Sequence, residues 1–230
     1  MLKTLYGVGV GPGDPELMTI KALNIIKECD YIALPISGAG ETVAYNIARG
    51  AYPDIEKKPM LELSMPMSRD KEVLRHHHQK AASQIAEVLD KGLSAAFLTL
   101  GDPTVYSTYI YVHEIMKERG YSPVIVPGVP SFCAAAARLS VSLTEASQPL
   151  CILPGSYENS HALLDLSASK VLMKTGRSAG RIRELIREKN IDDDVYVIQN
   201  CGMENEKITS LEEMDESYFS IIILKSRAEE

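Results

Sequence analysis

The chain has 230 residues, of which 45% are hydrophobic, 24% charged and 6% aromatic, and its formal net charge is −7 at pH 7. These proportions are those of a globular protein, so they exclude a disordered chain, a collagen-like repeat and a small disulfide-stapled scaffold. The acidic balance argues against nucleic acid as a broad partner and against docking on an anionic membrane surface.

The cysteines and the hydropathy give an expectation of compartment. Four cysteines lie far apart and form no CxxC pair: Cys29, Cys133, Cys151 and Cys201. This pattern argues against a zinc site or a disulfide framework and is typical of a reducing cytoplasm. No stretch approaches the roughly 18 uninterrupted apolar residues of a membrane span. We therefore expect a cytoplasmic protein without a membrane segment.

In the first half of the chain, apolar β-branched segments alternate with segments of helical period. The predicted strands are 5–10, 31–34, 60–63, 95–100 and 123–126. The predicted helices are 18–27, 41–49, 70–90 and about 106–118. This alternation predicts an α/β protein with largely parallel strand pairing.

The segment 126–130, Val-Pro-Gly-Val-Pro, is the densest punctuation in the middle of the chain. It predicts a junction between two α/β domains, 1–126 and 127–230. Beyond it, helices are expected at 132–139, 160–166 and around 182–186, and strands at 150–153, 171–173, 195–199 and 219–224, with a weaker one at 207–211. Because little helix separates the last strands, the second domain is expected to hold a mixed or antiparallel sheet.

A glycine-rich segment, 7–15, follows the first predicted strand. Glycines there allow another backbone or a ligand to approach closely, and a following helix N-terminus favours anionic groups. The spacing does not match the dinucleotide motif G-x-G-x-x-G, because the sixth position is Pro12 counted from Gly7 and Asp14 counted from Gly9. Two interpretations remain: a tight strand-to-helix connection, or a nucleotide-like ligand site of another kind.

Two further segments have a structural and a functional interpretation each. After the strand 95–100, Gly101 and Asp102 point to the carboxyl edge of the sheet, where open α/β sheets bind ligands. Alternatively, Asp102 caps a helix that Pro103 opens. The four alanines 134–137 allow a helix to lie against a flat ligand or, more commonly, against another element.

Histidine and basic clusters give weaker signals. His76, His77 and His78 diverge around a helix, because consecutive positions differ by about 100°, so a helix face is favoured over a metal site. Most of the arginines at 177, 181, 183 and 187 are expected to face solvent. Lys174 and Arg177, near a strand end, are the better candidates for meeting carboxylates. No Gly-x-Ser-x-Gly elbow supports a hydrolase.

The order and spacing of four motifs resemble those of the tetrapyrrole (corrin) methyltransferases. The motifs are the glycine-rich segment 7–19, LGDPTVYST at 100–108, VPGVPSFCAAAARL at 126–139 and VLMKTG at 171–176. Within the family, DYIALPIS at 30–37, the alanine run and Pro149-Leu150 make the chain most similar to the enzymes that methylate C20 of precorrin-2 or its cobalt form in cobalamin biosynthesis.

The resemblance implies two α/β domains with the active site in the cleft between them, a homodimer, a tetrapyrrole substrate and the cofactor S-adenosylmethionine. It implies that main chain contacts the cofactor more than side chains do. By position, the cofactor-binding residues are Gly11, Pro12, Leu100, Gly101, Asp102, Val105, Pro130, Ser131, Lys174, Cys201 and Gly202.

The catalytic hypothesis follows from the same resemblance. Asp102, Tyr106 and Lys174 orient the substrate or assist loss of the meso proton, and Lys174 and Arg177 meet the substrate's carboxylates. Pro35 stands where the related uroporphyrinogen methyltransferases have an acidic residue, which removes an obvious base. Methyl transfer from a sulfonium disperses charge, so a dry, aligned cavity assists it as much as a strong base does.

Alternative functions remain open at this stage. Within the fold, the chain could be another corrin-ring methylase, such as the C11 enzyme, or diphthine synthase, which methylates a protein. From other classes, a dinucleotide-dependent reductase or a non-catalytic nucleotide-binding module is possible, although the broken G-x-G-x-x-G argues against the reductase.

Overall fold

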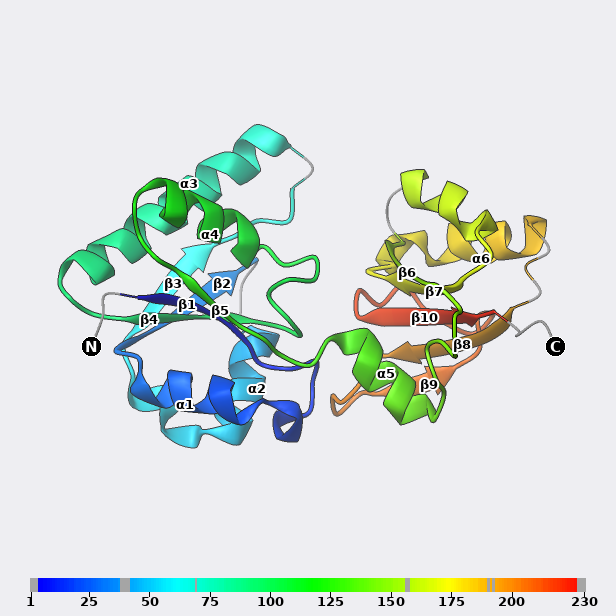
Figure 1. The fold of residues 1–230 in the computed structure, drawn as a ribbon, viewed down its shortest axis with the longest axis horizontal. Helices are drawn as coiled ribbons and strands as arrows, with labels where there is room; N and C mark the ends of the chain where they lie inside the picture. The colour runs from blue at the N-terminus through cyan, green and yellow to red at the C-terminus, as the bar shows by residue number, and fades with distance from the viewer. Residues whose placement is uncertain are drawn as a thin grey trace. The chain divides into compact units, whose positions relative to one another are not determined.

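The computed structural model describes residues 4–37, 42–68, 70–155, 158–189, 191 and 193–226, without the side chains of 158–161 and 177. The chain divides into two compact units, Met1–Pro130 and Ser131–Glu230 (Figure 1). Each unit has its own five-stranded sheet. Among the described residues, no helix has the length and hydropathy needed to cross a membrane.

The first unit is built on a parallel sheet. Its strands are β1 (Leu5–Gly9), β2 (Tyr31–Ile36), β3 (Met60–Ser64), β4 (Ala95–Thr99) and β5 (Val124–Val126), in the order β3-β2-β4-β1-β5. Its helices are α1 (Ile20–Glu28), α2 (Val43–Ala51), α3 (Lys71–Asp90) and α4 (Tyr109–Glu118), with the short 3-10 helices η1 (Pro15–Leu17) and η2 (Pro53–Lys57). All four strand pairs run parallel, so all five carboxyl ends lie at one edge.

Side-chain caps start three of these α-helices, and at α2 the Thr42 hydroxyl accepts from the N–H of Tyr45. The Thr19 hydroxyl accepts a hydrogen bond from the backbone N–H of Ala22 at the start of α1. The Asp70 carboxylate accepts from the N–H groups of Glu72 and Val73 at the start of α3. Each cap satisfies N–H groups that have no partner within the helix. The sequence signal for the long helix, Asp70 followed by an apolar stripe, is thereby confirmed.

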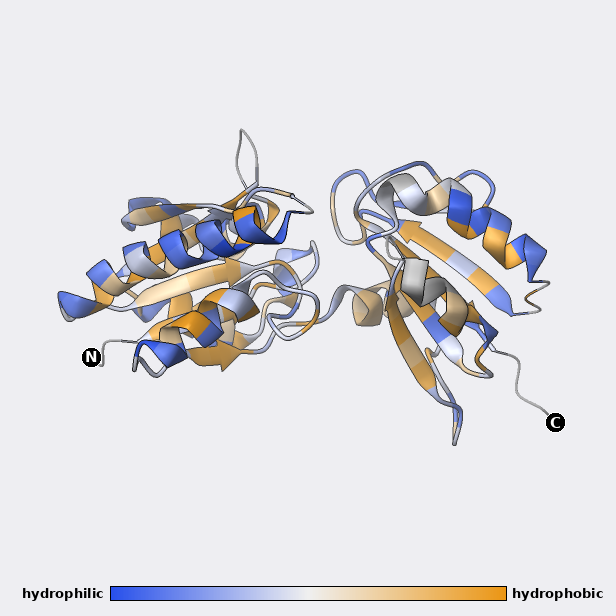
Figure 2. Cartoon of the chain, turned by 90° about the horizontal axis from the view of Figure 1, so that it is seen from above, coloured by the Kyte–Doolittle hydropathy of each residue, from blue (hydrophilic) through white to orange (hydrophobic). Residues whose placement is uncertain are grey.

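Helices cover both faces of the first sheet. On one face, α1 and α2 bury residues such as Ala22, Ile26 and Ala48 against Val8 and Leu98. The opposite face belongs to α3 and α4, whose buried side chains pack on other strand residues; they include Ala82, Ile85, Tyr109, Val112 and Met116. The strands are mostly hydrophobic along their length, whereas the helices carry hydrophilic residues as well (Figure 2). Burial on both faces explains the near-continuous apolar strands.

The topology places a crevice between two neighbouring strands. β1 leads into α1 on one face of the sheet, whereas its neighbour β4 leads into α4 on the other face. At such a switch point the connections leave in opposite directions, and open α/β sheets bind ligands there, outside the carboxyl ends of the strands.

The second unit has a mixed sheet. Its strands are β6 (Leu150–Pro154), β7 (Ser169–Met173), β8 (Asp194–Gln199), β9 (Lys207–Thr209) and β10 (Ser220–Lys225), in the order β6-β7-β10-β8-β9. Its helices are α5 (Ser131–Leu139), α6 (Ala179–Glu188) and the 3-10 helices η3 (Glu158–Asp165) and η4 (Gly176–Ser178). Only β6 and β7 pair parallel, and β10 pairs antiparallel with both its neighbours, so β6, β7 and β8 end at the same edge.

In this unit, α6 buries Ile182, Leu185 and Ile186 against Leu172 and Ile222. Helix α5 packs on β8 and β10, and its Ala134, Ala135 and Ala136 are buried. Small side chains let a helix approach a sheet closely, so the structural interpretation of the alanine run is confirmed for these three positions.

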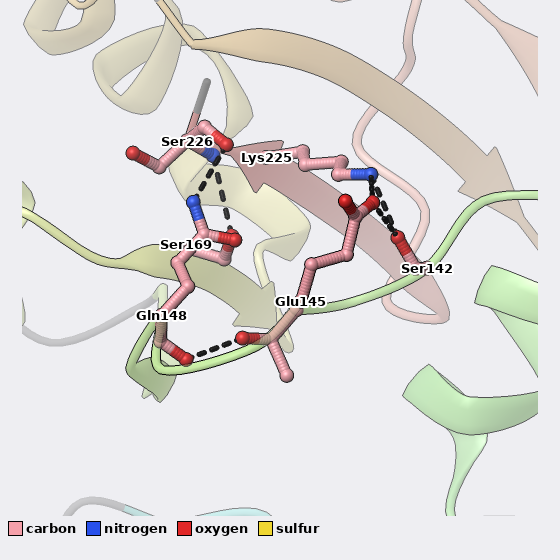
Figure 3. A network of polar contacts seen from close by, with 7 residues as sticks. Ser142, Glu145, Gln148, Ser169, Lys225 and Ser226 are labelled. Atoms are coloured by element: carbon pink, nitrogen blue, oxygen red, sulfur yellow. Dashed lines mark hydrogen bonds and ion pairs between the residues drawn. The ribbon is translucent and has the colours of Figure 1, made fainter. Parts of the chain in front are cut away.

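A polar network closes the second unit at the start of β6 and the end of β10 (Figure 3). The Lys225 ammonium donates to the Ser142 hydroxyl at 2.7 Å and to the Glu145 carboxylate at 2.5 Å. The Gln148 amide donates to the carbonyl oxygen of Ser226 at 2.8 Å, and its own oxygen accepts from the Ser169 hydroxyl at 3.3 Å. The connection between α5 and β6 is thus held against the last strand, and Lys225 and Ser142 lower the pKa of Glu145.

Every strand that the sequence predicted is present, and the mixed second sheet is confirmed. Two helix predictions were wrong in detail. Helix α4 begins at Tyr109 rather than near Tyr106, and the segment predicted as a helix at 160–166 is the 3-10 helix η3. Helix α2 begins at Val43, and the predicted start at Glu41 lies outside the described residues.

Candidate functional site

Three loops meet at the carboxyl edge of the first sheet, at the β1/β4 crevice. We call residues 9–11, 100–102 and 127–128 the three-loop joint. The N–H of Val10 donates to the carbonyl oxygen of Thr99 at 3.0 Å. Gly11 and Gly101 exchange two further hydrogen bonds, of 3.3 and 2.8 Å, in an isolated antiparallel bridge. Main chain of one loop therefore continues the pairing of β1 with β4 beyond the strands.

Glycine is required in the joint because its backbones nearly touch. A Cβ atom on Gly9 would lie 2.6 Å from the carbonyl oxygen of Gly101 and 2.6 Å from the nitrogen of Gly128. A Cβ atom on Gly128 would lie 2.2 Å from the same oxygen. Gly11 and Gly101 adopt φ angles of +80° and +70°, which glycine accepts without steric cost. Loops this close expose backbone groups rather than side chains.

Asp102 ties the second loop of the joint to the third. One carboxylate oxygen accepts from the N–H of Thr104 at 2.7 Å and from its hydroxyl at 2.5 Å, and the other accepts from the N–H of Gly128 at 2.9 Å. The side chain is buried. The prediction that Asp102 caps a helix opened by Pro103 was wrong, because α4 starts six residues after Pro103 and Asp102 instead bridges two loops.

The joint is suited to a ligand that is contacted mainly by main-chain groups. Beside it, at the end of β4, Thr99 is 7% exposed, and its hydroxyl has no hydrogen-bond partner among the described residues. A buried polar atom without a partner is costly and indicates a group that a ligand or an ordered water satisfies. The backbone cradle and this hydroxyl fit a polar cofactor contacted mainly by main chain, as the resemblance implies for S-adenosylmethionine.

Other residues near the joint have defined but different surroundings. The Thr19 hydroxyl donates to the carbonyl oxygen of Pro127 at 3.4 Å, which connects the start of α1 to the third loop. Tyr106, in the loop before α4, has φ +48° and is 41% exposed, and burial raises the pKa of its phenol. A non-glycine residue with positive φ is uncommon and is often found at functional sites.

A cavity of about 370 Å³ opens at the carboxyl ends of β2 and β3. It is lined by Ile36, Ser37, Glu62, Ser64 and Pro66. The strands β2 and β4 are neighbours, so this cavity and the joint lie along the same sheet edge. The cavity adds one carboxylate and two hydroxyl groups to that edge. None of its residues was predicted as a site residue, although Ile36 and Ser37 belong to the segment 30–37 that carries part of the resemblance.

The predicted residues of the second unit gather at one edge of their own sheet. Lys174 directly follows β7, and Cys201 and Gly202 follow β8; both strands end at the same edge, with the start of β10 between them. Lys174 has φ +55° and is half-buried, and burial lowers the pKa of its ammonium group. Burial raises the pKa of the Cys201 thiol to about 11. The side chain of Arg177 lies outside the description.

The structure therefore brings Gly11, Gly101 and Asp102 together and places Pro12, Leu100 and Val105 in the same loops. Sequence reasoning missed Gly128 and Thr99 as parts of this arrangement. The segment Val-Pro-Gly-Val-Pro at 126–130 could have indicated Gly128. No sequence pattern around Thr99 indicates a role for its hydroxyl. The basic residues behave as expected in part: Arg181 is exposed, whereas Arg183 donates to the carbonyl oxygens of Leu211 and Met214.

The three histidines of α3 diverge, as predicted. His78 is buried and stacks on Tyr111, with ring centroids 4.9 Å apart. His77 forms a hydrogen bond of 3.1 Å between Nδ1 and the carbonyl oxygen of Ser64, and His76 is exposed. His76 and His77 contact each other edge to face, with ring centroids 5.7 Å apart, whereas His78 lies against a different neighbour.

Comparison with known proteins agrees with this fold. Residues 4–215 match the family model of the Tetrapyrrole (Corrin/Porphyrin) Methylases. The chain is 35% identical to a probable cobalt-precorrin-2 C(20)-methyltransferase of Methanocaldococcus jannaschii, over 98% of this chain and 97% of that protein. It is 28% identical to the precorrin-2 C(20)-methyltransferase of a Sinorhizobium species, over 96% and 94%.

Solved structures share the fold. The cobalt precorrin-4 methyltransferase CbiF superposes with a TM-score of 0.76 at 19% identity, covering 97% of this chain and 95% of that one. A Thermus thermophilus uroporphyrin-III C-methyltransferase complexed with S-adenyl homocysteine superposes with a TM-score of 0.69 at 18% identity, covering 96% and 92%. With the matched family model and the relative from M. jannaschii, these findings show that the chain belongs to the tetrapyrrole (corrin/porphyrin) methylases, a family of methyltransferases.

Proposed function

We propose that this protein is an S-adenosylmethionine-dependent methyltransferase that methylates C20 of precorrin-2, in its cobalt-containing form, in cobalamin biosynthesis. The observation that supports this most directly is the three-loop joint, a main-chain cradle at the switch point of the first sheet. The two C20-specific relatives are similar along nearly the whole chain, which supports the substrate assignment.

In this proposal the joint holds part of the cofactor. The main chain of Gly11, Pro12, Leu100 and Gly101 supplies contacts, and Asp102 fixes the second loop to the third. Asp102 then acts as a positioning residue, because both carboxylate oxygens already accept hydrogen bonds within the loops. Val105, Pro130, Ser131, Lys174, Cys201 and Gly202 complete the proposed cofactor-binding set. The bound cofactor supplies a methyl group on a positively charged sulfur.

Methylation at C20 requires loss of the proton that this carbon carries. Lys174 is our candidate to accept it at Nζ, because burial lowers the pKa of its ammonium group and so increases the neutral fraction at neutral pH. Tyr106 is proposed to orient the macrocycle through its exposed phenol. Arg177 is the proposed cationic partner of the substrate's carboxylates, and the protonated form of Lys174 is the alternative partner if Lys174 is not the base.

The decisive experiment uses labelled S-adenosylmethionine and two substrates, metal-free precorrin-2 and cobalt-factor II. Gain of one methyl group at the bridging carbon C20 of the cobalt form is the expected result. Methylation of C11, or of neither substrate, would refute the assignment. Substituting Asp102, Tyr106 and Lys174 singly by Ala should reduce turnover while the chain stays folded, and unchanged turnover in all three would refute their roles.

Ligand class can be tested without substrate. S-adenosylhomocysteine should raise the melting temperature, because a ligand that binds only the native state stabilises it, and NADH and NADPH should not. Stabilisation by a dinucleotide alone would favour a reductase or a nucleotide-binding module.

We also propose that the enzyme works as a homodimer in the cytoplasm. The resemblance implies the dimer, and four unpaired thiols are typical of a reducing compartment. Light scattering of the purified protein at micromolar concentration should give about twice the mass of the chain. Fractionation of the native host should recover it without detergent.

A further inference from the structure

The turn between β8 and β9 contains Cys201 and Gly202, two of the second-unit residues that the proposed function assigns to the cofactor. Asn200 and Gly202 both have positive φ, +52° and +77°. The N–H of Asn200 donates to the carbonyl oxygen of Phe219, and the N–H of Met203 donates to the carbonyl oxygen of Asn200, each at 2.9 Å. The turn is thus sharply folded at the sheet edge.

Two carbonyl oxygens of this turn have no hydrogen-bond donor among the described residues. They are the carbonyl oxygens of Cys201 and Gly202. The Cys201 side chain is buried, and its packing in the interior of the unit restricts the position of the main chain at this residue. Carbonyl oxygens fixed in this way can accept hydrogen bonds from a ligand's amino or hydroxyl groups.

The carboxylate of Glu206 holds the backbone N–H of Gly202 in this turn. An oxygen of Glu206 accepts from the N–H of Gly202 at 2.9 Å, and its second oxygen accepts from Nε of Arg138 at 2.6 Å. The Glu206 side chain is 16% exposed, whereas that of Arg138 is 60% exposed. The hydrogen bond from the Gly202 N–H lowers the pKa of Glu206 most, and the bond from Arg138 lowers it further, so the carboxylate is charged at neutral pH.

Arg138 lies in the last turn of α5, 68 residues before Glu206. The chain of contacts therefore runs from helix α5 through one carboxylate to the main chain of the turn. Hydrogen bonds with a charged partner are stronger than neutral ones and hold a geometry more tightly. Glu206 joins these two elements through both of its oxygens.

We propose that Glu206, held by Arg138, is a positioning residue that fixes the Cys201–Gly202 main chain to receive the cofactor's adenosine. This inference rests on the proposed function, because that function makes this turn part of the cofactor site. Glu206 acts through Gly202 and makes no contact with the reacting atoms.

The test compares Glu206→Gln, Glu206→Ala and Arg138→Met with the wild-type chain by calorimetric titration with S-adenosylhomocysteine. Gln has the same shape, but it has a single acceptor oxygen and an NH₂ group that cannot accept, so it can keep a hydrogen bond from only one of the two donors. We expect affinity to fall about ten- to a hundredfold in Glu206→Gln, more in Glu206→Ala, and less in Arg138→Met, where the bond to Gly202 remains.

Glu212→Gln is the matched control. Glu212 pairs with Arg187 at 2.5 Å in the same unit but outside the turn. This variant should bind S-adenosylhomocysteine like the wild type. Amide hydrogen exchange of Gly202 gives a second readout, which should accelerate in both Glu206 variants and not in the control.

The outcomes distinguish a failure of the positioning role from a failure of the proposed function. Wild-type affinity in Glu206→Gln, together with faster exchange at Gly202, would overturn the positioning role while leaving the proposed function intact. Absence of binding by the wild-type chain would refute the proposed function and this inference with it. If Glu206→Ala does not fold, Glu206→Gln and Arg138→Met still decide the question, because Gln keeps the size of Glu and Met replaces the aliphatic stem of Arg138, which is exposed.

Discussion

Gly128→Ala is the sharpest perturbation that the three-loop joint offers. The added Cβ would lie 2.2 Å from the carbonyl oxygen of Gly101, whereas real Cβ atoms keep at least 3.0 Å, so backbone must move by roughly 0.8 Å. It would also lie 2.8 Å from the carbonyl carbon of Gly9. Both neighbours are main chain, so no side-chain rotation relieves the overlap.

The expected cost has two parts. Overpacking of this kind destabilises by about 1–3 kcal/mol, and for a chain of this size each kcal/mol lowers the melting temperature by about 2–4 °C. Displacement of the joint should also weaken binding of S-adenosylhomocysteine at least about tenfold, which corresponds to ~1.4 kcal/mol. Turnover should fall further, because a misplacement of about 1 Å can cost a hundredfold.

The assay combines thermal unfolding with calorimetric titration of S-adenosylhomocysteine. Gly180→Ala is the control, since a Cβ there meets no atom within 4 Å and the residue lies inside α6. Ala at that position should leave binding unchanged and stabilise the helix by about 0.5–1 kcal/mol. If Gly128→Ala binds S-adenosylhomocysteine as the wild type does, the joint is not the cofactor cradle.

Three more predictions concern single side chains. Asp102→Asn removes the acceptor that faces the N–H of Gly128, so S-adenosylhomocysteine affinity should drop in a titration while circular dichroism stays native; wild-type affinity would contradict the bridging role. Asp193→Ala leaves the Lys170 ammonium, 3% exposed, without its carboxylate partner at 3.0 Å, and should cost about 3–5 kcal/mol in urea unfolding, with much of the loss recovered by adding Lys170→Met. Burial lowers the pKa of His113 below the ordinary value of about 6.5, so its contribution to stability is full above that pH and is lost as pH falls from there. In the wild type the urea midpoint should therefore fall between pH 7 and pH 5, and in His113→Gln it should fall less. The same fall of the midpoint in both proteins would refute this.

The sequence is informative about the fold because each strand carries its own signal. Parallel strands buried on both faces appear as short apolar runs, and 95–100 is such a run, with β4 buried along its whole length. The prediction for α4 failed because Asp102 and Pro103 are typical of a helix start. The structure uses the Asp102 carboxylate for Gly128 instead, a contact between residues 26 positions apart that no local pattern contains.

The same limit applies to the candidate site. Gly11 and Gly101 were singled out because glycines after a strand allow close approach and because the resemblance places them in cofactor loops, and the structure shows positive φ at both. Glu206 was not singled out, since its importance depends on Arg138, 68 residues away, and on one backbone N–H. Charged surface residues are too common for sequence alone to identify the one that is held between two elements.

The three-loop joint also bears on how this family can change over time. Amide groups are present at every position of a chain, so a joint built from them survives replacement of nearly any side chain around it. Asp102, whose carboxylate ties two of the loops, and the positions where a Cβ would collide, such as Gly9 and Gly128, must stay fixed. Most of the sequence around the joint can therefore change while the main-chain geometry is kept. Residues that contact the substrate can then be replaced independently, which allows relatives to methylate other positions of the macrocycle.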